Sequence, residues 1–210
     1  MSFFREIFGP SQEEVWSQFA DEIEGHFINK GFWKGKKVEV RYNNWDIVFD
    51  TFSRSSGKSS TTYTRVRCLF KNIDGFEFEI YKKSIFSGIG KVFGMQDIEI
   101  GHEDFDEKYI IKSNDETKIR ELLSNDKIRE IINSFVKADS IENIKFEINN
   151  HEGLFGQDLP DDVSSLYFET IGVVKDLERL RSIYMLFALV LNKLVLMDSA
   201  DNGNPGVTLE

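Results

Sequence analysis

The chain has 210 residues, with 36 acidic against 26 basic side chains and 40% hydrophobic residues, which is typical of a folded globular protein and excludes a disordered one. Its single cysteine, Cys68, excludes an intramolecular disulfide. The longest apolar run, residues 183–191, is too short for a membrane span, and the N-terminus lacks the pattern of a secretory signal. We therefore expect a cytoplasmic protein, with peripheral membrane association left open.

The predicted elements begin with an amphipathic helix over 11–29, because Ser11 and Glu14 form a capping box ahead of apolar residues at helical spacing. Four alternating segments follow, at 37–42, 45–52, 61–70 and 76–81, and predict an antiparallel meander over 37–81. The Ser/Gly-rich run 53–60 is typical of a hairpin loop.

The second half of the chain alternates strands with helices. A strand at 109–111 leads into a helix capped by Ser113 and Glu116, and a further helix begins at Ser124 to Asp126. Strands are predicted near 141–148 and 165–173, then a long apolar helix over about 174–197. We expect one α+β domain over 1–198, in which a mostly antiparallel sheet packs against helices, and a flexible tail over 199–210.

The last helix is apolar on more than one side. Its stripe between Ile183 and Val195 is wider than a single buried face requires. A helix of this kind must be covered on most sides, either within the monomer or by a partner chain. Burial in the monomer is favoured, and a homodimer through Ile183–Val195 is the alternative.

One segment resembles a known family. The pattern of Ile98, Ile100, Gly101, Phe105-Asp106, the strand 109–111, Asp115, Arg120 and Leu122-Leu123 is similar to a bacterial family of uncharacterised domains, and the similarity extends over about 61–196. Members of that family often carry transmembrane helices before the soluble part. The resemblance implies no activity, so no catalytic residue is carried over.

Histidines and acids offer one candidate polar site. His102, Asp104 and Asp106 lie in one loop, and an enzyme would need this loop to line a concave pocket. The alternative, that they are surface polar residues, is favoured because neither an HExxH motif nor a cysteine pair is present. No cofactor or metal site is predicted.

Charge is distributed unevenly along the sequence. Residues 30–91 carry a net charge of +7 and the remaining residues −17. This basic segment could bind nucleic acid or an anionic membrane surface through Lys34, Lys36, Lys37, Arg41, Arg65 and Arg67. The favoured alternative is that these charges occupy the solvated face of a sheet, or pair with acidic parts of the chain.

These observations favour an uncharacterised bacterial cytoplasmic protein that acts as a non-enzymatic binding or interaction module. Two rival functions stay open: an anion-binding module that uses the segment 30–91, and an enzyme with its site in the 102–106 loop. The first predicts that the six basic residues gather on one exposed face. The second predicts a pocket at His102.

Overall fold

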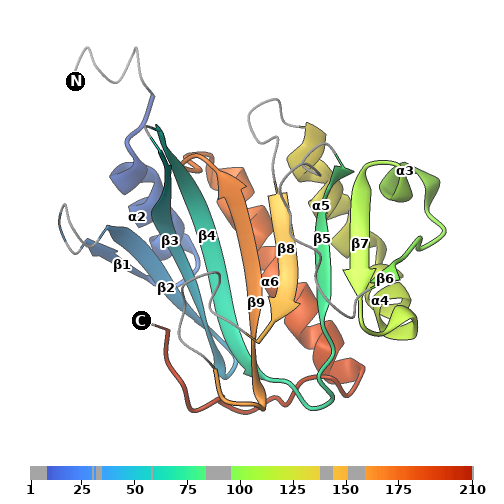
Figure 1. Ribbon diagram of the computed structural model, residues 1–210. Coiled ribbons are helices and arrows are strands. Elements are labelled where there is room, and N and C mark those ends of the chain that lie inside the picture. The colour runs from blue at the N-terminus through green and yellow to red at the C-terminus, as the bar shows by residue number, and fades with distance from the viewer. Residues whose placement is uncertain are drawn as a thin grey trace.

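The computed structural model describes residues 9–29, 31, 35–57, 59–83, 96–137, 144–150 and 159–209. In these residues nine strands form one antiparallel sheet, in the order β1-β2-β3-β4-β9-β8-β5-β7-β6, and the longer helices lie behind it in Figure 1. The strands are β1 (His26–Asn29), β2 (Lys36–Tyr42), β3 (Trp45–Ser56), β4 (Ser59–Lys71), β5 (Phe78–Lys82), β6 (Gln96–Asp97), β7 (Tyr109–Ser113), β8 (Ile144–Asn149) and β9 (Val163–Ile171). The helices are α2 (Gln12–Glu22), α3 (Glu103–Asp106), α4 (Glu116–Leu123), α5 (Asp126–Lys137) and α6 (Leu177–Leu196).

The predicted α+β fold is confirmed, but the predicted meander is wrong beyond β4. Strands β9 and β8 lie between β4 and β5, although they come much later in the chain. The burial of β9 explains its central place, because every residue from Val163 to Thr170 is buried. A strand buried on both faces must lie in the interior of a sheet, with neighbours on each side.

The N-terminal helix is shorter than predicted. Helix α2 ends at Glu22, and residues 26–29, expected to be helical, form the edge strand β1. Gly25 explains the change, because a Cβ atom at this position would lie 2.9 Å from the carbonyl oxygen of Glu39. Only glycine lets the chain approach β2 so closely and turn back as a strand.

One helix cap differs from the prediction by two residues. Ser113 lies in β7, and its hydroxyl donates to the carbonyl of Glu77. The side chain of Asp115 caps α4 instead, since it accepts a hydrogen bond from the Lys118 amide at 3.0 Å. The side chain of Asn125 accepts from the amides of Lys127 and Ile128 at the start of α5, within the range predicted for the second cap.

The hairpin of β3 and β4 and the C-terminal segment are more regular than predicted. The two strands pair as far as Ser56 and Ser59, so most of the predicted Ser/Gly loop is strand. At the other end of the chain, Ser199 and Ala200 are buried, Ala200 forms a bridge with Asn72, and the amide of Asp201 donates to Lys71. The segment predicted to be a flexible tail is therefore attached to the sheet at its start.

Helix α6 is buried mainly within the monomer. Its inner side chains join the core beneath the sheet together with α2, α4 and α5. On its outer side Met185 keeps 47% and Leu196 78% of their surface exposed. The alternative, a homodimer through Ile183–Val195, stays a hypothesis. None of the described helices has the length and apolarity needed to cross a membrane.

Candidate binding face

The sheet face opposite α2, α4, α5 and α6, called the front face, carries two rows of mostly polar side chains. Residues paired across antiparallel strands point to the same face, so the register defines these rows. The first row contains Val48, Arg67, Tyr167, Glu147 and Glu79, and the second contains Asp50, Arg65, Glu169, Lys145 and Tyr81. In the second row, charged side chains therefore run without interruption from Asp50 on β3 to Lys145 on β8.

Beside the second row, on β3 and β4, arginines stack on aromatic rings. The rings of Phe52 and Tyr63 stack with centroids 5.3 Å apart and planes 19° apart. The guanidinium carbon of Arg54 lies 5.0 Å from the centroid of Phe52 and 4.9 Å from that of Tyr63. The guanidinium of Arg65 lies 5.0 Å from Phe52 as well. We call Phe52, Arg54, Tyr63 and Arg65 the arginine platform.

Carboxylates fix the two arginines of the platform. Glu169 accepts two hydrogen bonds from Arg54, at 2.9 and 2.8 Å, and a further one from the hydroxyl of Tyr167. Asp50 accepts two from Arg65, at 2.8 and 2.6 Å. Partial burial disfavours the Arg54 cation, but the Glu169 carboxylate outweighs burial, and the pKa of Arg54 is raised. Both guanidiniums are thus held in one orientation by bidentate pairs.

Near the β5 end of the rows, two buried glutamates share one lysine. Lys145 Nζ lies 3.3 Å from Glu79 Oε1 and 2.6 Å from Glu147 Oε2, and the two glutamate side chains are only 3% and 9% exposed. Burial raises the pKa of Glu147, and the Lys145 ammonium limits this rise. Among the described residues, neither Glu79 Oε2 nor the Tyr81 hydroxyl has a hydrogen-bond partner, although both are buried.

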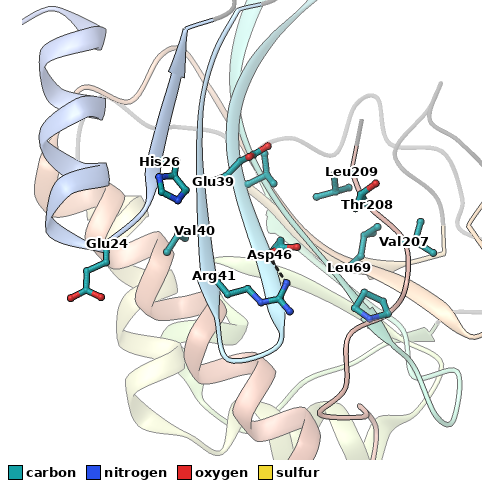
Figure 2. A pocket seen from close by; sticks show the side chains of 12 residues that line it. Glu24, His26, Glu39, Val40, Arg41, Asp46, Leu69, Val207, Thr208 and Leu209 are labelled. Carbon is teal, nitrogen blue, oxygen red and sulfur yellow. Dashed lines mark hydrogen bonds and ion pairs between the residues drawn. The ribbon is translucent and has the colours of Figure 1, made fainter.

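A cavity of about 280 Å³ lies between the sheet and the C-terminal segment. Figure 2 shows Val207 and Leu209 near Leu69, and Arg41 with Asp46 on the side nearer His26. Its lining comes from β1 to β4, from the turn before β1 and from the last residues of the chain, and consists of Glu24, His26, Glu39, Val40, Arg41, Asp46, Val48, Leu69, Pro205, Val207, Thr208 and Leu209.

The six basic residues predicted to bind anions do not form one free cationic face. Lys34 lies outside the described residues. The other five each pair with a carboxylate: Lys36 with Glu13, Lys37 with Glu39, Arg41 with Asp46, and Arg65 and Arg67 with Asp50. Lys36 reaches a residue of α2 and so lies toward the helices. Local carboxylates therefore offset most of the charge that a polyanion would need.

The three residues of the predicted polar site at 102–106 have different surroundings. Asp106 accepts from the backbone amides of Ile100, Gly101 and His102 at 2.8 to 3.0 Å, which gives this carboxylate a structural role. His102 and Asp104 are exposed at the start of α3. The carboxylate is thus used to order the turn and not to face a substrate. In the described part of the chain, no group of three or more His, Cys, Asp or Glu residues could hold a metal ion.

Cys68 lies on the core side of β4. Its side chain is fully buried beneath the helices, and burial strongly raises the pKa of its thiol. A thiol that stays protonated is a poor nucleophile. The position therefore agrees with a residue that fills the core.

Sequence reasoning found Arg65 of the arginine platform and missed Phe52 and Arg54 as site residues. A signal was present, because Phe52 and Arg54, like Tyr63 and Arg65, are two residues apart and share a strand face. Spacing within one strand could not predict the pairing of Arg54 with Glu169. These residues are 115 positions apart and meet only because β9 lies beside β4.

Comparisons with known proteins give little further information. No protein-family model matches the chain, and no curated protein matches it. Among solved structures, the chain is similar to the crystal structure of the mycobacterial trehalose monomycolate transport factor A, TtfA, at 6% identity and a TM-score of 0.48. The similarity covers 87% of this chain and 94% of that chain. A likeness at this level carries no argument about function.

Proposed function

We propose that the protein is a non-enzymatic interaction module that binds a segment of a partner protein on the arginine platform. One observation carries this proposal: Arg54, 48% exposed, is held over two aromatic rings by a bidentate bond to Glu169. An exposed arginine ordinarily moves among many rotamers. Fixing it in advance removes much of the entropic cost of binding. Aromatic residues and arginine also supply most of the binding energy in protein interfaces.

The chemistry of the platform indicates what it binds. A guanidinium carries five N–H donors, and Glu169 accepts two of those of Arg54, which leaves donors for an anionic group. Ile171, 39% exposed and paired in register with Tyr63, extends the apolar surface beside the two rings. Around the platform the guanidiniums of Arg54, Arg65 and Arg67 lie against the carboxylates of Asp50 and Glu169. The fitting partner is a segment with an aromatic side chain beside a carboxylate.

A nucleic acid is a less suitable partner. Its affinity would depend on many phosphate contacts, whereas the predicted cations are paired and the whole chain has a net charge of −10. A short acidic and aromatic peptide needs only one or two such contacts. The same arginines could then serve a protein ligand without attracting polyanions.

The experiment uses short peptides and the full chain. Amide signals of the ¹⁵N-labelled protein are followed by NMR while acetyl-Glu-Phe-Glu-amide is added. We expect shifts in β3, β4 and β9 around Phe52, Tyr63 and Ile171. Acetyl-Lys-Phe-Lys-amide and acetyl-Glu-Ala-Glu-amide test the anionic and the aromatic requirement separately. We expect both to bind at least fivefold more weakly.

A matched pair of variants identifies the residue. Arg54→Lys keeps the charge but loses the planar bidentate fork, and we expect it to weaken the Glu-Phe-Glu peptide at least fivefold. Arg120→Lys is the control, because Arg120 is similarly exposed and pairs with Glu116 on α4, away from the front face. Equal affinity of the wild type and Arg54→Lys, or shifts that map to the helices, would refute the proposal.

A further inference from the structure

Two apolar side chains interrupt the polar rows of the front face. Val48 on β3 and Leu69 on β4 are only 5% and 3% exposed, and both line the cavity of about 280 Å³ beside the C-terminal segment. This place lies apart from the arginine platform, because Asp46, which also lines the cavity, is six residues from Phe52 along β3, or about 20 Å. The cavity and the platform share the front face but no side chain.

The wall across from Val48 and Leu69 comes from residues 203–209, which we call the C-terminal strap. Pro205, Val207 and Leu209 are half-buried and line the cavity, whereas Gly206 and Thr208 between them are exposed. Figure 2 shows Val207 and Leu209 near Leu69. The strap thus turns alternate apolar side chains toward the sheet, as an extended segment does.

The strap is fixed at its start and held weakly beyond it. Ala200 forms a bridge with Asn72, and the side chain of Asn44 donates to the carbonyl of Asn202 at 2.7 Å. No hydrogen bond joins residues 203–209 to a described strand. The cavity also separates the strap from part of the sheet, and apolar groups that do not touch gain no dispersion energy. The strap can therefore leave the sheet while its start stays attached.

The polar side of the cavity carries no free charge that faces the apolar side. Asp46 is paired with Arg41 at 2.8 Å, and Glu39 is paired with Lys37. Glu24 lies at the far edge, where its side chain points away from the strap (Figure 2). The volume of about 280 Å³ exceeds the roughly 150 Å³ that holds a benzene molecule. The space therefore suits an uncharged group as large as a phenyl ring.

We infer that Val48 and Leu69 form a docking site for an extended, uncharged segment of a partner protein, and that the C-terminal strap occupies this site when the partner is absent. The strap itself indicates the class of ligand, because it is an uncharged segment with apolar side chains at alternate positions. A partner segment with larger side chains fills the cavity that Pro205 and Val207 leave, and so displaces the strap. This site does not depend on the function proposed for the arginine platform.

The probe is acetyl-Asn-Leu-Thr-Phe-Thr-amide, in which leucine and phenylalanine are two positions apart. It is added to the ¹⁵N-labelled full chain, and the amide signals are followed by NMR. We expect shifts around Val48 and Leu69, movement of the Val207 and Thr208 signals toward those of an unfolded segment, and a dissociation constant on the order of 1 mM. Acetyl-Asn-Leu-Phe-Thr-Thr-amide has the same composition but adjacent apolar residues, and we expect it to bind at least fivefold more weakly.

Variants separate displacement of the strap from binding beneath it. Val207→Ser weakens the strap, so we expect it to tighten the binding of the probe at least threefold. Val173→Ser is the control, because Val173 is also half-buried but follows β9 near the start of α6, and we expect no change in affinity. Val48→Thr places a hydroxyl in the apolar wall and should weaken the probe at least threefold.

Four results would overturn the inference: no shift of the cavity amides up to 20 mM probe, equal affinity for the two peptides, unchanged or weaker binding to Val207→Ser, or unchanged binding to Val48→Thr. Weaker binding to Val207→Ser would mean that the probe uses the strap as part of its site. None of these results bears on the peptide site at Arg54, which is read from signals around Phe52 and Tyr63.

Discussion

Replacement of Lys145 by methionine tests whether the buried charges of the front face depend on one another. Lys145 lies between Glu79 and Glu147, which face each other directly in the register of β5 and β8. Methionine retains most of the volume of the lysine stem but no charge. Two nearly buried carboxylates would then be left side by side in the sheet.

The size of the effect follows from burial. Removing one partner of a buried ion pair costs about 3–5 kcal/mol of unfolding free energy. The side chain of Lys145 is 32% exposed, which allows water to screen part of the charge, so we take the lower end. We expect Lys145→Met to lose about 3 kcal/mol at pH 7 to 8. Lys127→Met, which breaks an exposed pair with Glu130, should lose less than about 1 kcal/mol.

The effect has a definite pH dependence. Burial raises the pKa of Glu147 above its ordinary 4.5, so the folded state binds a proton more readily than the unfolded state. Such a group favours folding below its unfolded pKa, and this contribution is lost as the pH rises through the folded pKa. Without Lys145 the pKa of Glu147 rises further. The loss caused by Lys145→Met should therefore be small near pH 4 and grow toward pH 7.

Urea unfolding at several pH values between 4 and 8, followed by circular dichroism, measures this difference. At each pH the free energy of unfolding of Lys145→Met is subtracted from that of the wild type. This subtraction removes the pH dependence that comes from carboxylates present in both proteins. A difference that stays constant with pH, or one below 1 kcal/mol at pH 7, would show that Lys145 does not limit the rise in the pKa of Glu147.

Two further substitutions test individual polar groups by the same unfolding assay. Asp106→Ala should cost about 1–3 kcal/mol, because three amides lose their acceptor, and an unchanged stability would leave this carboxylate free for another role. Tyr81→Phe removes a buried hydroxyl that has no partner among the described residues, so we expect stability to be unchanged or to rise by up to about 1 kcal/mol. A loss of more than 1 kcal/mol would indicate that the hydroxyl is bonded in solution.

Local chemistry predicted most elements but not their neighbours in the sheet. The alternation in β2 to β4 and the apolar stripe of α6 depend on residues close in sequence, and these elements were predicted, although β3 continues four residues beyond its predicted end. The β1 strand was missed because His26 and Phe27 continue the helical spacing of α2. Only the contact of Gly25 with the backbone of Glu39 requires the turn, and that contact is tertiary.

The uneven distribution of charge can be read from the sequence. The ion pairs that balance it depend on the fold. Some basic residues of the segment 30–91 pair within it, as Arg65 does with Asp50, because hairpins join residues close in sequence. Others cross to the acidic part of the chain, as Arg54 does to Glu169. The Arg54–Glu169 pair exists only because β9 enters the sheet between β4 and β8. The same insertion places a carboxylate where it can fix an exposed arginine, so strand order and the proposed binding platform have one physical origin.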